Sequence, residues 1–256
     1  MNKLSLGDRM KGYEGVSRHY LIKRMPVIIR IDGKNFHSFT KGFKKPFDDI
    51  LVKVMQDTML ELCERVEGCV MGYTQSDEIS LVLCDYHKLD TEAWFGNNLW
   101  KLCSVSASIA TSAFNKYFRN ASIGVSEKYE RRIDKANFDS RAFNIPREEV
   151  CNYLIWRQKD AVRNSVQSTA QAYFSHKRLE GVACDKALDM LKAEKGVVWE
   201  EYPLHLQRGS CCIKSPVILN EGTDNEIIRN KWGIDLKIPV FSDNRDYVEK
   251  RINFEV

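Results

Sequence analysis

The stretch IIRIDGKNFHSFT, from Ile28 to Thr40, begins with apolar β-branched residues and ends as a polar, basic segment. Its isoleucines are typical of a buried strand, which we place at 25–32. The strand ends on the carboxylate of Asp32, and four lysines without any acidic residue follow between positions 33 and 47. A basic loop of this kind suits either a bound triphosphate or ordinary solvent exposure.

Further elements along the chain alternate between helix and strand patterns. We predict helices at 46–66, 99–118 and 146–174, a two-stranded hairpin at 68–84 and a strand at 138–145. The order begins as β-α-β-β-α-β, the arrangement of ferredoxin-like and polymerase-palm domains. The predicted fold class is therefore α+β, with an antiparallel sheet, helices packed on one face and C-terminal additions.

The length of 256 residues suits one core with a smaller appendage. We place a palm-like domain, expected to be the catalytic one, at 1–175. A C-terminal extension at 176–256 would pack on the same domain. It contains a short predicted helix at 179–195 and weak strand patterns after Lys214.

Composition narrows the class of protein. The formal net charge of +4 permits a nucleotide or nucleic-acid partner without indicating one. Eight cysteines without a C-x-x-C pair are typical of reduced, buried thiols, which predicts a cytoplasmic location and argues against a structural zinc site. No window resembles a membrane span, and the N-terminal stretch is too polar for a signal peptide, so we expect no membrane partner.

Two further carboxylates, Asp77 and Glu78, lie at the tip of the predicted hairpin. In a β-α-β-β unit the first strand lies beside the hairpin, so Asp32 and this tip can meet at one sheet edge. Carboxylates there would suit Mg²⁺, with the Gly33 carbonyl as a further ligand. Alternation along a strand favours Asp77 as the ligand and gives Glu78 a supporting role. Ordinary turns use the same residues, so both interpretations stay open.

The third predicted helix carries polar residues at three- and four-residue spacing, which we interpret as a solvated face: Arg157, Asp160, Asn164 and Gln167. We expect the tryptophans of the helical segments to lie in the core or at an interface: Trp94, Trp100 and Trp156.

Several motifs together resemble the tRNA-His guanylyltransferase family, and more closely its tRNA-His guanylyltransferase-like branch. They are RIDGKNFHSFT, FKKPFDD, GYTQSDEISLV, and FDSR followed by YLIWRQKD. The similarity runs in order from about Asp8 to Asn164 and continues more weakly through RGSCCIK, at 208–214.

The resemblance implies a palm-like enzyme that adds nucleotides to an RNA 5′ end. It implies two Mg²⁺ ions held by Asp32, the Gly33 carbonyl and Asp77, with Glu78 as a third catalytic residue. The segment expected to bind the nucleotide is Asp32, Gly33, Lys34, Asn35, Phe36 and His37, together with Lys45, Ser76, Asp77 and Lys101. Lys45 and Lys101 match positions linked to 5′-end activation. We expect RNA contacts at Arg141, Arg157 and Asn164. The implied partners are tRNA, ATP and GTP, in a homotetramer.

One departure refines the expected reaction. Eukaryotic members that act on tRNA-His carry a His-Ile-Asn-Asn-like motif after the Trp-Arg-Gln segment, where this chain has AVRNSVQS and only Asn164 aligns. This favours template-dependent 3′-5′ repair of truncated tRNA 5′ ends over dedicated tRNA-His activity. We expect ATP- or GTP-dependent activation of the 5′ end and two-metal phosphoryl transfer.

Two alternatives remain at this stage. A nucleotide cyclase would use a related palm, but diguanylate cyclases carry Gly-Gly at the hairpin tip, where this chain has YTQSDE. A non-catalytic RNA-binding module of the same outline would place aromatic residues on its central strands. The corresponding segments here, VIIRI and ISLVL, are aliphatic.

Overall fold

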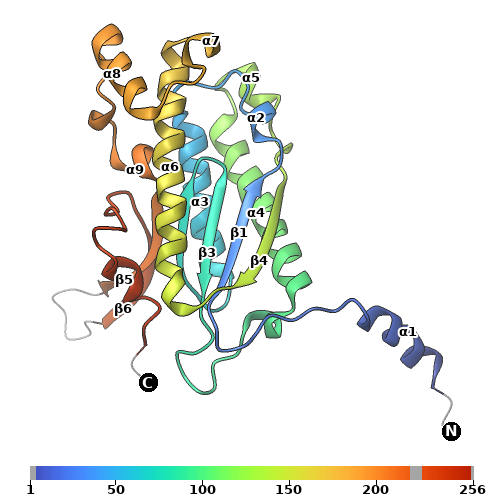
Figure 1. Cartoon of the computed structure of the whole chain (residues 1–256). Helices are drawn as coiled ribbons and strands as arrows, with labels where there is room; N and C mark the ends of the chain where they lie inside the picture. The colour runs from blue at the N-terminus through green and yellow to red at the C-terminus, as the bar shows by residue number, and fades with distance from the viewer. Residues whose placement is uncertain (1–3, 220–226, 255–256) are drawn as a thin grey trace.

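The computed structural model describes residues 4–219 and 227–254. Within them, six strands form one antiparallel sheet in the order β4-β1-β3-β2-β5-β6 (Figure 1). The strands are β1 (Val27–Gly33), β2 (Cys69–Gln75), β3 (Glu78–Leu83), β4 (Phe138–Asn144), β5 (Ser210–Leu219) and β6 (Ile227–Asp235). The first four strands have the order of a ferredoxin-like or palm domain, which confirms the predicted α+β class.

The long helices are α3 (Asp49–Arg65), α4 (Leu99–Ser122) and α6 (Val150–Tyr173). They fall within a few residues of the three predicted helices. The shorter ones are α1 (Leu6–Gly15), α2 (Phe36–Phe39), α5 (Glu127–Glu130), α7 (His176–Leu179), α8 (Cys184–Lys195), α9 (Leu204–Arg208) and α10 (Asp246–Glu249). No helix in the described part of the chain is both long and apolar enough to cross a membrane.

Helices cover both faces of the sheet. The helices α3 and α4 lie on one face, over a core that includes Ile29, Ile31 and Phe114. For these two helices, the prediction of helices on one face is correct. The third helix, α6, covers the opposite face, where Ile28 and Leu154 are fully buried (Figure 1). Because β1 carries isoleucines on both of its faces, the sheet needs a second cover.

Side chains at the helix starts fix where α3 and α4 begin. The Asp48 carboxylate accepts a hydrogen bond from the Leu51 N–H at 2.9 Å, and the Asn98 side chain accepts one from the Lys101 N–H at 3.1 Å. Both are N-caps, which satisfy N–H groups that lack a partner within the helix. In α4 the small, buried Ser106 contacts Ser140 of β4 at 2.8 Å between hydroxyl oxygens, so this helix packs closely on the sheet.

The C-terminal part of the chain extends the same sheet. β5 pairs with β2, and β6 pairs with β5 along its length, so the weak strand patterns after Lys214 correspond to strands that begin at Ser210 and Ile227. Of the helix predicted at 179–195, only 184–195 form α8. The boundary near residue 175 stays a prediction. At the other end, α1 projects away from the body and buries none of its residues (Figure 1).

Candidate active site

The hairpin tip meets the end of β1. Gln75 and Glu78 close the hairpin as partners, and Ser76 takes a positive φ of 51° in the turn between them. The Gly33 N–H donates to the Asp77 carbonyl at 3.0 Å, and Asp32 lies directly opposite Glu78 in the ladder. The carboxylates that the sequence placed at one sheet edge are therefore neighbours. Asp77 belongs to the turn, so the alternation that governs Glu78 does not apply to it.

Asp77 and Asp32 form a negatively charged corner. Burial raises the pKa of Asp77, and the charge of Asp32 raises it further, while the Ser76 hydroxyl, which donates at 3.0 Å, opposes the rise. Neither carboxylate forms a salt bridge with a described residue. A cation would relieve this repulsion. The described residues contain no group of three or more metal-binding side chains, so an ion here would take its other ligands from backbone, water and substrate, as Mg²⁺ does.

Glu78 is held quite differently. It is buried, and Arg157 of α6 donates to it twice, from Nε at 2.7 Å and from a terminal nitrogen at 2.6 Å. Burial raises the pKa of Glu78, and the Arg157 fork opposes that rise. Arg157 is only 5% exposed and also contacts Asp160 at 3.0 Å, so the solvated-face interpretation is wrong for this residue. Its donors face Glu78 and Asp160.

The loop after β1 combines core packing with exposed polar groups. The Phe36 side chain is buried, with its ring centroid 4.9 Å from that of Phe39 and 5.3 Å from that of Phe114. A Cβ on Gly33 would lie 2.3 Å from the Phe36 ring, so this ring packing requires the glycine. Only the Phe36 backbone can therefore face a ligand, at the start of α2, where N–H groups lack helical partners. Lys34, Asn35 and His37 are exposed.

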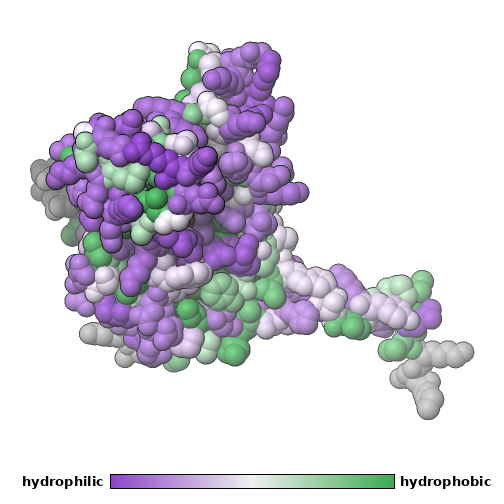
Figure 2. Space-filling model, turned by 45° about the horizontal axis from the view of Figure 1, so that its top comes forward, coloured by the Kyte–Doolittle hydropathy of each residue, from purple (hydrophilic) through white to green (hydrophobic). Residues whose placement is uncertain are grey.

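An open cavity of about 430 Å³ joins this loop to the hairpin tip. His37 and Lys45 line it on the loop side, and Ser76 and Asp77 line it on the hairpin side. Lys44 also lines it, but its ammonium group pairs with Asp49 at 2.6 Å. Lys45 makes no ion pair within the described ranges, so its charge is available to a ligand. The surface around this end of the molecule, turned forward in Figure 2, is mainly hydrophilic.

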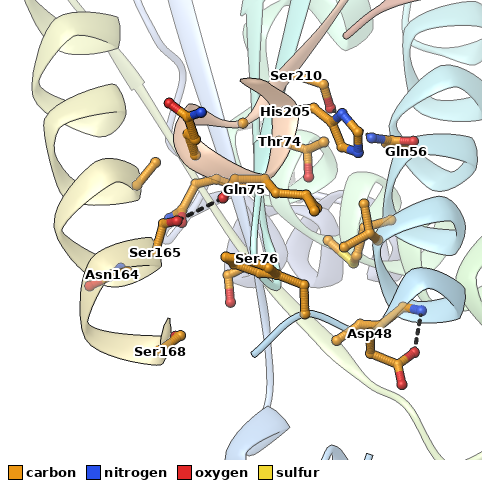
Figure 3. Close-up of a pocket in the computed structure, with 18 of the residues that line it drawn as sticks. Asp48, Gln56, Thr74, Gln75, Ser76, Asn164, Ser165, Ser168, His205 and Ser210 are labelled. Atoms are coloured by element: carbon orange, nitrogen blue, oxygen red, sulfur yellow. Dashed lines mark hydrogen bonds between the residues drawn. The ribbon is translucent and has the colours of Figure 1, made fainter. Parts of the chain in front are cut away.

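A second cavity, of about 150 Å³, adjoins the first and shares Pro46, Asp48 and Ser76 with it (Figure 3). It lies between α3, β2, α6 and α9. Its polar lining includes Gln56, Thr74, Gln75, Asn164, Ser165, Ser168, His205 and Ser210. Burial lowers the pKa of His205, which favours a neutral imidazole. Sequence reasoning found only Asn164 in this set, and it assigned Asn164 to RNA.

Lys101 and Arg141 are among the predicted residues that line neither cavity. Lys101 lies at the start of α4, beside Phe95. Lys101 lies ten residues before Thr111, or about 15 Å along the helix. The Thr111 hydroxyl accepts a hydrogen bond from the Phe138 N–H, at the start of β4. Arg141 lies on the edge strand β4 and pairs with Asp139 at 3.0 Å.

The strand order, with carboxylates at the end of β1 and at the hairpin tip, defines a nucleotidyltransferase of the palm-like class. The sequence model of the family described as tRNAHis guanylyltransferase matches residues 7–146, and the chain belongs to this family. Its members are metal-dependent nucleotidyltransferases.

Solved structures and a curated relative agree with this assignment. A bacterial tRNA(His) guanylyltransferase-like protein in complex with ATP is 42% identical, with a TM-score of 0.86 and coverage of 98% of this chain and 100% of that chain. One in complex with GTP is 39% identical, with a TM-score of 0.78 and coverage of 97% and 99%. The probable tRNA(His) guanylyltransferase of Dictyostelium discoideum is 28% identical over 214 residues, covering 77% of this chain and 78% of the relative.

Proposed function

We propose that this protein adds nucleotides in the 3′-5′ direction to the 5′ end of tRNA, guided by the opposite strand, and so repairs truncated 5′ ends. The observation that carries the proposal is the pair Asp32 and Asp77, which lack a cationic partner among the described residues. They lie at the sheet edge where the cavity lined by Lys45 opens. A charged corner beside a free lysine suits a triphosphate and its metal ions.

The donor set fits Mg²⁺. Asp32, Asp77 and the Gly33 carbonyl would hold two ions, which is the number that the family resemblance implies. Bound Mg²⁺ supplies neutralisation of phosphate charge and lowers the pKa of an attacking hydroxyl. The raised pKa of Asp77 supports this assignment, because burial and, to a lesser extent, the charge of Asp32 both disfavour its ionised form, which a bound cation would stabilise.

The two adjoining cavities suggest how a nucleotide lies. Its triphosphate would occupy the larger cavity, where His37, Lys45 and Ser76 contact phosphate oxygens. Exposed Lys34 and Asn35, and the backbone N–H groups of Phe36 and His37, lie beside that position. The nucleoside would enter the smaller cavity, where Asn164 and the polar side chains of Figure 3 offer hydrogen bonds.

The reaction then needs an activated 5′ end. A 5′-monophosphate is a poor electrophile, because the group that leaves would be water or hydroxide. Transfer of AMP from ATP releases pyrophosphate and converts the 5′ phosphate into an anhydride. The 3′ hydroxyl of the incoming nucleotide attacks that phosphate, forms the new ester and expels AMP. An RNA that already carries a 5′-triphosphate skips the first transfer and releases pyrophosphate instead. Lys45 is proposed to bind phosphates during activation.

Glu78 and Arg157 position the site rather than contact the reacting atoms. Their paired hydrogen bonds fix the start of β3, one residue after Asp77, against α6. This positioning role replaces the RNA contact that the sequence suggested for Arg157.

We further propose that the protein assembles as a homotetramer in the cytoplasm. The helix α1 exposes Leu6, Met10 and Tyr13 at helical spacing, although a ten-residue helix is marginal without a packing partner. Lys101 lies far from the cavities of its own chain, so a role in activation would require a neighbouring subunit. Eight free cysteines suit a reducing compartment. Light scattering on the wild type and on a variant with serine at the three α1 positions tests the assembly.

The direct test of the function uses a tRNA that lacks its first nucleotide. Incubation with Mg²⁺, ATP and GTP, followed by mapping of the 5′ end, should show restoration of the nucleotide that the opposite strand specifies. A cyclic product from GTP alone would favour a nucleotide cyclase. Binding of the tRNA without any addition would favour an RNA-binding module.

A further inference from the structure

A tryptophan lies exposed on the α6 side of the catalytic strands. Trp94 is buried as the sequence predicted, but Trp156 is 53% exposed, so it does not belong to the core. Its ring centroid lies 4.5 Å from the guanidinium carbon of Arg157, 5.9 Å from that of Arg30 and 5.9 Å from the ring of Tyr153. The ring is therefore fixed from below by packing and open to solvent above, which is the form of a stacking platform.

Two arginines lie side by side on the sheet, and one of them, Arg30, lies next to this ring. Arg30 of β1 and Arg141 of β4 are directly opposite each other in the ladder, so their side chains leave the same face. Like charges in that arrangement are destabilising unless an anion lies between them. The Nε atom of Arg30 is buried and has no hydrogen-bond partner in the described part of the chain. A phosphate oxygen is an acceptor that would satisfy such a donor.

The nearby carboxylates do not satisfy Arg30. Glu78 and Asp160 are both bound by Arg157, and Asp139 is bound by Arg141. Lys159 and Arg163 continue along α6 from Trp156 at spacings of three and seven residues, on the same side of the helix. Arg163 pairs with Asp160, whereas Arg30 and Lys159 form no salt bridge within residues 4–219 and 227–254. Positive charge around an exposed aromatic ring is typical of a single-stranded nucleic-acid surface.

We propose that an unpaired nucleotide of the RNA stacks on Trp156 while its phosphate lies between Arg30 and Arg141. The inference rests on the proposed function and names a contact of the same site. Bases inside a duplex already stack on each other, so a ring of this kind selects an unpaired base. The RNA strand under repair ends at Asp32, two residues along β1 from Arg30, or about 7 Å. Beyond the 5′ end under repair, only the opposite RNA strand continues. The stacked nucleotide therefore belongs to the unpaired 3′ part of that strand, past the nucleotide that acts as the template.

The test compares two hairpin RNAs with the same recessed 5′ end. One carries three unpaired nucleotides beyond the templating position, and the other ends at that position. Fluorescence anisotropy without nucleotides should show that the wild type binds the tailed RNA more tightly. Trp156→Ala should weaken binding of the tailed RNA by about 5- to 150-fold and leave the tail-less RNA unchanged. Trp156→Phe, which keeps an aromatic face, should restore most of the preference.

Two further variants complete the design. Arg141→Gln should also reduce binding of the tailed RNA selectively, by about 10-fold. Trp232→Ala removes a tryptophan that packs on a cation, Lys214, at the far end of the sheet, and should keep the full preference for the tail. Thermal unfolding of each variant shows whether it is folded at the temperature of the assay.

Several results would overturn the inference. The wild type could bind both RNAs equally, or Trp156→Ala could weaken both to the same extent or neither. A failure of the proposed function is separate, because it appears as a wild type that adds no nucleotide to either RNA.

Discussion

The two faces of the sheet are made from the same strands but differ in chemistry. On the face under α3 and α4, Ile29 and Ile31 continue an apolar core up to the end of β1. On the face under α6, the alternate residues of β1 are Ile28, Arg30 and Asp32 in turn. This face of the strand therefore changes from apolar to charged as it approaches the hairpin tip. Alternating side chains thus let one strand hold the fold with one face and build the site with the other.

Removal of either unpaired carboxylate should give the largest loss of activity. Asp32→Ala and Asp77→Ala should each reduce nucleotide addition by about 1,000-fold or more, because several kcal/mol of charge stabilisation disappear. Thermal unfolding should show an intact fold, since neither side chain forms a salt bridge that the fold uses. Single-turnover addition measures the effect. A rate within tenfold of wild type at saturating Mg²⁺ would show that the metal assignment is wrong.

The buried ion pair should couple stability to activity. Arg157→Met leaves the Glu78 carboxylate buried without its partner, and should lower the free energy of unfolding by about 3–5 kcal/mol. Addition should also fall at temperatures where the variant is folded, because the turn that carries Asp77 loses its anchor to α6. The matched control is Lys159→Met, two residues along α6 and exposed, which should change stability by about 0.5 kcal/mol or less. Equal stability of the two variants would contradict the positioning role.

The opposite face should behave differently. Phe114→Ala removes a fully buried ring that packs on Phe36 and Phe138, and should cost about 3–5 kcal/mol of stability. At temperatures well below its unfolding transition, this variant should keep nucleotide addition within a few-fold of wild type. Chemical denaturation and single-turnover rates, measured beside those of Arg157→Met, test the difference. A variant of Phe114 that loses as much activity as that of Arg157 would show that the faces are not separable.

Lys45→Ala should affect one step selectively. A lost charge-assisted phosphate contact costs about 1.5–3 kcal/mol, or roughly ten- to a hundredfold in rate. The loss should appear with 5′-monophosphate RNA, which needs activation, and largely vanish with 5′-triphosphate RNA. Lys44→Ala is the matched control, because Lys44 is already paired with Asp49. Equal loss on both RNAs would assign Lys45 to the incoming nucleotide or to general RNA binding.

The smallest effect concerns pH and stability. Because the pKa of Asp77 is raised in the folded protein, its charged form destabilises the fold, and this cost is absent below the ordinary value of 3.8. Asp77→Asn should therefore be more stable than wild type at pH 7 in EDTA, and the difference should shrink as the pH falls toward 4. Denaturation curves across this range measure it. A difference that does not depend on pH would mean that the Asp77 charge is not the cause.

The sequence was sufficient for the β-α-β-β-α-β unit and for the meeting of Asp32 with the hairpin tip, because hydrophobic patterns and β-α-β-β topology are local or nearly so. It was not sufficient for Arg157, which has the spacing of a solvated helix face but is buried by its partner Glu78, 79 residues away. The cavity that includes Gln56, His205 and Ser210 is assembled by tertiary packing from segments without common spacing. The same holds for Trp156, whose exposure depends on how α6 packs on the sheet.

The most direct test of the central claim contrasts the two neighbouring acids at the hairpin tip. The measurement is the rise in unfolding temperature that Mg²⁺ with GTP gives beyond GTP alone, in wild type, Asp77→Asn and Glu78→Gln. Asp77 is free to bind a cation, whereas Glu78 is occupied by Arg157. The rise should therefore be lost in Asp77→Asn and kept in Glu78→Gln. A rise that persists in Asp77→Asn, or one that disappears only in Glu78→Gln, would contradict the account.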